Sequence, residues 1–334
     1  MKSHTVDIIV AGRILRETII NNSSQISIDR PGGNALYAAA GINLWRKKAS
    51  IVAKISEDFP ESKLDDTKND IQGIKKVPAF FDQRFFYTYD KNSNIIFDHP
   101  QKYFFQLDRK LPKLLLGYAA PRESEGVSKK EHLYSITHAD IPVEYHTCNN
   151  LLICQIDHYS HNILPSFYRL KSNGRIFMVA SAEYMHPAFW IDIPPMIRGS
   201  EVFITSEDLI RKLFLGKSND LVEMAEQIAS FGVELVIISD PHNGQILFEA
   251  STKNKYRIPQ YPFHDIDRLQ ALSAFTGGFC AGYVQSFNPL LSVLKGNITQ
   301  SIKCEGSTPQ FILDCLPELR DARLDDLKEQ VIHL

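Results

Sequence analysis

The sequence predicts an α/β fold in which helices cover both faces of a mostly parallel sheet. Short apolar runs of strand length recur through the middle of the chain and alternate with helical segments, as they do in parallel sheets. Two segments rich in glycine and alanine, one near each end, open helices that can pack closely. The length of 334 residues and the 44% hydrophobic content suit one large domain, residues 1–334, with a sizeable core.

The first elements of the chain are predicted strands. Val6–Val10 is a short apolar run that ends at a small Ala-Gly pair, and Ile14–Ile20 continues as a second strand. A third apolar run, Ala49–Ile55, is the next strand of the main sheet. The separation of these runs leaves room for a helix before the third strand.

The segment Pro31–Gly41, a glycine turn followed by a run of alanines, lies between the second and third of these strands. Gly32 and Gly33 permit positive φ angles, and Asn34 can cap the helix that follows. The run of alanines after Asn34 lets this helix pack tightly on a sheet. Read alone, the segment is equally consistent with an ordinary helix-opening turn.

Residues 76–107 differ from the rest because aromatic residues alternate with polar ones on both sides of Lys91–Asn94. This pattern predicts a β-hairpin. The aromatic faces between Phe80 and Phe105 suit either an ordinary core contact or a surface that binds a partner. We expect a partner surface.

The middle of the chain supplies the remaining strands and the helices between them. The predicted strands are Tyr134–Thr137, Leu151–Gln155, Ile176–Ala180, Glu201–Ile204 and Leu235–Ser239. The clearest predicted helices are Tyr159–Leu170 and Asn219–Phe231.

The stretch Phe263–Phe287 is the most informative part of the sequence. Its second half, Ser273–Val284, predicts a helix whose start is rich in small residues, Gly277 and Gly278 among them. Small residues let a backbone or a ligand approach closely. The free N–H groups and the dipole of a helix N-terminus can hold an anion.

This stretch resembles the C-terminal signature of ribokinase-like (PfkB-type) carbohydrate kinases, D-x-x-G-A-G-D-x-F-x-x-G-F. Asp267 and Ala271 match the signature, as does the Phe-Gly half that follows. The two glycines of the signature fall on Gln270 and Leu272, and its catalytic Asp falls on Ser273. The resemblance implies a three-layer α/β/α sandwich with a small β-lid, formed by residues near 13–30 and 76–107.

The resemblance extends to the N-terminal glycine turn and implies a substrate site there. Gly32, Gly33 and Asn34 would line it. Arg16 is the nearest equivalent of the Asp that usually binds a substrate hydroxyl in this family.

The same resemblance implies a nucleotide site with several departures. The family motif N-x-x-E, whose Glu organises magnesium, has Ser206 and Leu209 at its two positions. Glu207 and Asp208 beside them either substitute for that Glu or simply favour a helix N-terminus. The residues implied for the nucleotide and its anion hole are Gly244, Gln270, Ala271, Leu272, Gly277, Gly278 and Asn297, and Pro241 removes one N–H donor near them.

Charge and composition exclude some other functions. The net charge of −2 gives no reason to expect nucleic acid or membrane as partner, and no apolar run is long enough to span a bilayer. The N-terminus lacks a signal-peptide pattern, so we expect a cytoplasmic protein. The five cysteines form no C-x-x-C pair and read as reduced thiols. Several histidines cluster between residues 132 and 161, but their spacing favours structural roles over a zinc site.

Three functions remain open. The first is a pseudokinase that binds a ligand or a protein partner, because a Ser at the position of the catalytic Asp is a poor proton acceptor. The alternative is an active kinase that uses MgATP to phosphorylate a sugar or nucleoside hydroxyl. The third is a sensor that binds a nucleoside, sugar or nucleotide without turnover. We expect the first, with no bound metal, and a homodimer formed through the lid.

Overall fold

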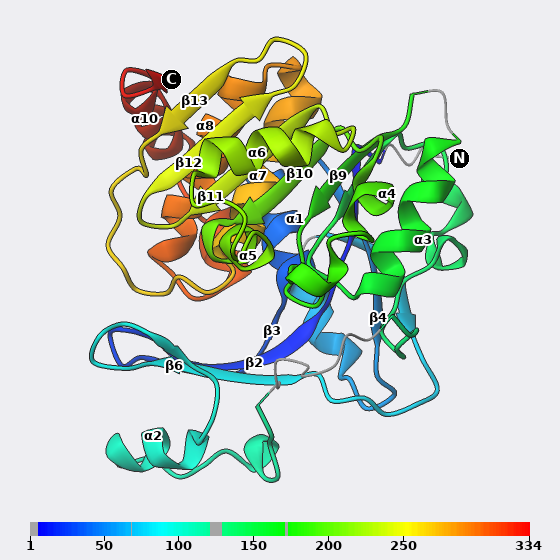
Figure 1. The fold of residues 1–334 in the computed structure, drawn as a ribbon. Helices are drawn as coiled ribbons and strands as arrows, with labels where there is room; N and C mark the ends of the chain where they lie inside the picture. The colour runs from blue at the N-terminus through cyan, green and yellow to red at the C-terminus, as the bar shows by residue number, and fades with distance from the viewer. Residues whose placement is uncertain (1–5, 68, 121–128, 171–172) are drawn as a thin grey trace.

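The described residues of the computed structural model, 6–67, 69–120, 129–170 and 173–334, form a ten-stranded sheet with a smaller sheet beside it (Figure 1). The order of the large sheet is β14-β13-β12-β11-β10-β9-β8-β1-β4-β5. Seven neighbouring strands of this sheet run parallel: β11, β10, β9, β8, β1, β4 and β5. The strands β12, β13 and β14 are antiparallel additions at one edge. Their bounds are β1 (Ile8–Ala11), β4 (Ala49–Ile55), β5 (Asp70–Lys76), β8 (Asn150–Ile153), β9 (Arg175–Val179), β10 (Val202–Ser206), β11 (Leu235–Asp240), β12 (Gly244–Glu249), β13 (Lys255–Ile258) and β14 (Ile332–His333).

Helices cover both faces of this sheet, which confirms the predicted fold class. In β1, Ile8 and Val10 point to one face, and Ile9 and Ala11 point to the other; all four are buried. One face carries α1 (Asn34–Leu44), α7 (Ala271–Ser286), α8 (Pro289–Cys304), α9 (Pro309–Leu313) and α10 (Pro317–Lys328). The other face carries α3 (His158–Arg169), α4 (Ile193–Ile197), α5 (Glu207–Leu213) and α6 (Leu221–Ser230).

The smaller sheet is the lid. It consists of β2 (Leu15–Ile20), β3 (Ile26–Gly32), β6 (Arg84–Tyr89) and β7 (Ile95–Ile96), in the order β3-β2-β6-β7. Alternation along β2 turns Glu17 and Ile19 toward the main sheet, whereas Ile20 packs on the opposite face of the lid. The lid therefore presents one face to the body of the protein.

The predicted hairpin at residues 76–107 is wrong in its second half. After the two-residue strand β7, the chain forms helix α2 (Pro100–Gln106) instead of a long strand. His99 adopts a left-handed conformation before the helix, and Pro100 occupies a first-turn position that proline favours. In Figure 1, α2 lies along the outer side of the lid.

The outer face of the lid is buried by this segment of the same chain. Phe86 and Phe104 are 0% and 1% exposed and form a cluster with Leu115 and Ile20. The backbone N–H of Phe86 donates to the Tyr118 hydroxyl, 3.2 Å away. The aromatic residues on which the predicted dimer surface depends are thus partly used within one chain.

The predicted strand Tyr134–Thr137 is also wrong. The backbone N–H of Ile136 donates to Ser160 Oγ at 2.8 Å, and that of Thr137 donates to Asp140 Oδ2 at 2.8 Å. Side chains therefore take the hydrogen bonds that a neighbouring strand would supply. The other four predicted strands of this region correspond to β8, β9, β10 and β11, and the two predicted helices to α3 and α6.

Membrane and metal features are absent from the part of the chain that the structure describes. No helix in it is both long and apolar enough to cross a membrane. Its His, Cys, Asp and Glu side chains form no group of three or more that could hold a metal ion, and the five cysteines are free thiols.

Candidate functional site

The start of α7 lies at the position of the catalytic signature. Gln270 precedes the helix with φ 65° and ψ 7°, a left-handed conformation that glycine adopts at little cost and that other residues adopt at about 1 kcal/mol or more. Ser273, on the first turn, is 4% exposed, and its hydroxyl donates to Gln270 Oε1 at 2.9 Å. The hydroxyl of Ser273 therefore contacts an amide and not a carboxylate that could take its proton.

The backbone at this helix start keeps part of an anion site. Among the described residues, none accepts a hydrogen bond from the backbone N–H of Leu272 or Ser273. Free N–H groups and the dipole at the start of a 16-residue helix attract negative charge. The side chain of Leu272 is partly buried against the apolar core. The predicted anion-hole role of Leu272 and its neighbours stays a prediction.

Asp267, the nearest acid in the signature, is a structural anchor. It is fully buried and accepts hydrogen bonds from the hydroxyls of Tyr87 at 2.8 Å and Tyr89 at 2.6 Å. Lys303, also fully buried, places its ammonium 3.2 Å from the same carboxylate and donates to the carbonyls of Asp267 and Gly306. The two tyrosines belong to β6, so this cluster also ties the lid to the main body.

Glu17 is a second buried acid, and the sequence reasoning missed it. It is 1% exposed, and its carboxylate accepts from Gly33 N–H at 2.8 Å and the Tyr37 hydroxyl at 3.2 Å. Burial raises the pKa of Glu17 to about 7; the Gly33 N–H opposes this shift and the nearby Asp267 carboxylate adds to it. A side chain at Gly32 would place its Cβ 2.1 Å from the Glu17 carboxyl group, so a larger residue there would force this carboxyl group to move.

Arg16, predicted to bind substrate, points away from this cluster. Its guanidinium pairs with Asp29 of β3, at 2.8 and 2.9 Å, and lies 4.0 Å from Asp58. Arg16 is thus engaged by acids of the chain itself, and its predicted role in substrate binding stays a prediction. Because side chains alternate along β2, Glu17 is the one that faces the glycine turn. That alternation was the signal by which Glu17 could have been found.

The glycine turn itself is formed as predicted, with one difference. Gly33 has φ 89° and precedes α1, but Asn34 does not cap the helix. Its Oδ1 accepts from Arg13 N–H at 2.8 Å, and its Nδ2 donates to the Gln155 carbonyl at 2.6 Å. Asn34 therefore joins the segment after β1 to the segment after β8, at the carboxyl edge of the sheet where ligands of α/β proteins bind.

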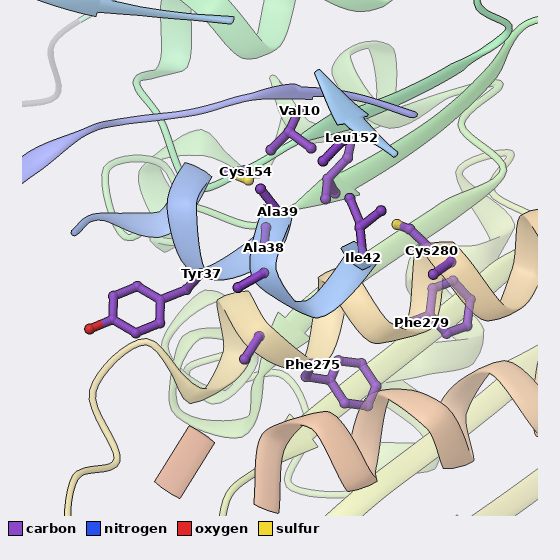
Figure 2. Packing of buried hydrophobic residues seen from close by; sticks show 14 of the residues in the cluster. Val10, Tyr37, Ala38, Ala39, Ile42, Leu152, Cys154, Phe275, Phe279 and Cys280 are labelled. Atoms are coloured by element: carbon purple, nitrogen blue, oxygen red, sulfur yellow. The ribbon is translucent and has the colours of Figure 1, made fainter. Parts of the chain in front are cut away.

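Gly277 and Gly278 serve a helix contact. A Cβ at Gly277 would lie 2.0 Å from the Ala38 carbonyl oxygen, and one at Gly278 would lie 2.2 Å from Thr299 Oγ1. Figure 2 shows the surrounding core, in which Ala38 and Ile42 of α1 belong to the same apolar cluster as Phe275 and Phe279 of α7. The two glycines let α7 approach α1 and α8, and this contact leaves no room for a nucleotide beside them.

Side-chain amides fill the region that the resemblance assigns to the border of the adenine. Asn297 is fully buried, donates to Gln245 Oε1 at 2.6 Å and to the Pro259 carbonyl at 2.9 Å, and accepts from Tyr261 N–H at 3.0 Å. The network continues through Gln260, Gln300 and Ser239. Each of these groups is held by another group of the chain, and so the network needs no ligand.

The turn between β11 and β12 also leaves little space for a ligand. Gly244 has φ 85°, and a Cβ there would lie 2.1 Å from the Ile258 carbonyl oxygen. A cavity beside Asn243 and Gly244 has a volume of only about 20 Å³. It holds about one water molecule and is far too small for a nucleotide.

The segment aligned with the family's magnesium motif forms a helix start. Ser206 caps α5 by accepting from Leu209 N–H at 3.3 Å. Glu207 pairs with Arg211 one turn later at 2.8 Å. This arrangement agrees with the helix N-terminus that the sequence left open for Glu207 and its neighbour.

Comparisons with known proteins agree with this architecture. No protein-family model matches the chain. The chain is 24% identical over 295 residues to a cytidine kinase of Thermococcus kodakarensis. This alignment covers 83% of this chain and 88% of the relative.

Solved structures are similar over nearly the whole length. A ribokinase from Thermotoga maritima matches with a TM-score of 0.62 at 19% identity, covering 96% of this chain and 100% of that one. A fructokinase from Vibrio cholerae, with fructose, ADP and calcium bound, matches at 0.66 and 14% identity, covering 96% and 99%. A nucleoside kinase from Burkholderia thailandensis in complex with inosine matches at 0.66 and 15% identity, covering 96% and 97%. The chain therefore has the ribokinase-like fold that its two signature turns predict.

Proposed function

We propose that this chain binds a small molecule of the nucleoside or sugar type between its lid and its main sheet, and that it does not transfer phosphate to it at a useful rate. The observation that carries the proposal is the environment of Ser273. Its hydroxyl stands where the resemblance places a catalytic carboxylate, and it donates to Gln270. Phosphoryl transfer to an alcohol needs a group that accepts the proton, and an unassisted serine does not accept it at neutral pH.

The acid nearest in sequence gives no replacement. Both carboxylate oxygens of Asp267 already accept tyrosine hydroxyls, and Lys303 pairs with the same group. Freeing Asp267 for catalysis would leave the buried ammonium of Lys303 without its counter-charge, which is costly.

The nucleotide side supports the same proposal. The amides around Asn297 satisfy one another, and the cavity near Gly244 holds about 20 Å³. A nucleotide at this place would have to displace hydrogen-bonded side chains and bond to the groups it exposes.

The ligand-binding part of the proposal rests on what the fold keeps. The lid, the glycine turn at Gly33 and a buried acid, Glu17, are all in place. A buried carboxylate that is retained beside a turn at the carboxyl edge of a parallel sheet is more consistent with ligand recognition than with stability, since a buried acid destabilises a fold.

A second function, an active ATP-dependent kinase, is favoured by three specific observations. The proteins to which this chain is similar are named as kinases. In addition, the N–H groups of Leu272 and Ser273 are free to hold a phosphate, and the Glu17 pKa of about 7 suits a general base. In this alternative, Glu17 and not Ser273 would take the proton.

The release of ADP from MgATP separates the two functions. The purified chain is incubated with a panel of nucleosides and sugars, beside its Glu17→Gln variant. The proposal predicts a wild-type rate at least about a hundredfold below one per second, the lower end of ordinary enzyme turnover. A rate near one per second that is lost in Glu17→Gln would replace the proposal with the kinase alternative.

A further inference from the structure

A cavity of about 500 Å³ lies between the lid and the α8–α9 side of the main body. This volume is in the usual range for small-molecule pockets. The lid contributes Ile19, Asn21, Gln25, Ile26 and Ser27, and the main body contributes His264, Ile266, Glu305, Gly306, Ser307, Thr308 and Phe311. The lining shares no residue with the predicted substrate and nucleotide positions, so the cavity is a separate place on the molecule.

One wall of the cavity is an aromatic surface. Phe311, at the start of α9, packs on Gly306 so closely that a Cβ there would lie 2.2 Å from the ring. The ring nevertheless remains 41% exposed. Ile26 and Ile266 add further apolar surface to the lining. A supported and partly exposed aromatic ring is a platform on which a flat molecule stacks.

The polar groups of the lining are mainly hydrogen-bond donors. Asn21 Nδ2 donates to Gln25 Oε1 at 3.2 Å and to Ser307 Oγ at 3.3 Å, so these two oxygens are occupied as acceptors. Thr308 Oγ1 accepts the N–H of Phe311 at 3.3 Å. The amide NH₂ of Gln25 and the O–H groups of Ser307 and Thr308 have no acceptor among the described residues, and they remain available as donors.

The charges around the cavity exclude a phosphorylated ligand. No lysine or arginine lines it. Glu305 is paired with Arg323 at 3.0 and 3.1 Å, so that arginine is engaged by its carboxylate. Lys303 lies buried behind the cavity, against Asp267. Among the described residues, an anion in the cavity would meet neutral donors, the carboxylate of Glu305 and the imidazole of His264 but no lysine or arginine, so a neutral ligand is favoured.

We propose that this cavity binds a neutral planar heterocycle that carries hydrogen-bond acceptors, such as a nucleobase with or without its ribose. The flat ring stacks on Phe311, and its ring nitrogens and carbonyl groups accept from Gln25, Ser307 and Thr308. Because the donors come from both the lid and the main body, the bound molecule holds the lid closed.

The test uses uracil, uridine and adenosine as probes, with ribose and UMP as comparators, in titration calorimetry of the full chain. Uracil, uridine or adenosine is expected to bind more tightly than ribose, and UMP no more tightly than uridine. Phe311→Ala should weaken binding by about five- to a hundredfold, the range for the loss of one stacking contact. Phe105→Ala, on an 84% exposed ring outside the cavity, is the matched control and should leave affinity unchanged.

A second variant keeps the test decisive if Phe311→Ala does not fold. Gln25→Ala removes one donor at an exposed position of the lid turn and should weaken binding about tenfold. Equal affinity for ribose and uridine, no binding of any probe heterocycle, or full affinity in both variants would each overturn the cavity proposal. None of these results affects the ADP-release measurement, so the two proposals fail independently.

Discussion

At the scale of single residues, the protein keeps an unusual pair of buried acids between lid and body. Asp267 is neutralised by Lys303, whereas the hydrogen-bond partners of Glu17 among the described residues are the Gly33 N–H and the Tyr37 hydroxyl. The difference explains why burial raises the pKa of Glu17 so strongly. The two acids therefore differ in their charged surroundings.

Glu17 should make the stability of the protein fall as the pH rises. The folded-state pKa, about 7, lies above the ordinary value of 4.5, so the folded chain holds a proton that the unfolded chain has lost. Its stabilising contribution is complete below about pH 4.5 and is lost as the pH rises to 7. The shift corresponds to about 3 kcal/mol.

The measurement compares wild type with Glu17→Gln by urea unfolding between pH 5 and pH 8. The wild-type free energy of unfolding should decrease over this range relative to that of the variant, which cannot ionise at this position. Parallel pH profiles for the two proteins would show that Glu17 is not titrating in the fold.

Lys303 should be essential to stability. Replacing it by methionine leaves the buried carboxylate of Asp267 without its counter-charge, and we expect a loss of about 3–5 kcal/mol in the free energy of unfolding. Lys328, whose pair with Asp325 is exposed, is the control, and Lys328→Met should cost about 1 kcal/mol or less. Similar small losses in both variants would mean that the buried pair contributes little.

At the scale of elements, the lid shows what local sequence can and cannot predict. The strand β4 has the predicted bounds because five of its seven residues are apolar and six of the seven are buried, as in a strand covered on both faces. Helix α2 was missed because its aromatic residues suit a strand equally well, and the decisive signal was Pro100. In β2, alternation was readable from sequence, but which face looks inward depends on α1 and the glycine turn, which lie elsewhere in the chain.

The segment that covers the lid should stabilise it. Phe104 of α2 is 1% exposed and packs against Phe86 of β6. Phe104→Ala should lower the free energy of unfolding by about 3–5 kcal/mol. Its neighbour Phe105 is 84% exposed, and Phe105→Ala should change the free energy of unfolding by no more than about 0.5 kcal/mol. Thermal unfolding of both variants checks this, and equal effects would contradict the packing described.

At the scale of the whole molecule, the segment that covers the outer face of the lid affects whether two copies of the chain can associate there. The predicted homodimer depends on an aromatic face that α2 and residues 113–118 bury from within. A dimer through that face would require this segment to move away, so we now expect a monomer at micromolar concentration. Light scattering measures this directly, and a stable dimer would restore the original prediction.

The fold was predictable from sequence to a larger extent than the site. Strand alternation and the two glycine-rich turns depend on local patterns, and they predicted the parallel sheet and α7. The surroundings of Glu17, Lys303 and the amides around Asn297 depend on contacts between residues far apart in the chain, such as that of Asn297 with Gln245, 52 positions away. Local sequence patterns do not contain such contacts.

The central claim is that a ribokinase-like fold persists here without phosphoryl transfer. The most direct test is the rate of ADP release from MgATP, with a panel of nucleosides and sugars, by wild type, by Ser273→Ala and by the triple variant Gln270→Gly, Leu272→Gly, Ser273→Asp. We predict no turnover above background in the first two proteins and the best chance of a gain in the third. Wild-type turnover of about one per second or more would contradict the claim, whether or not it persists in Ser273→Ala.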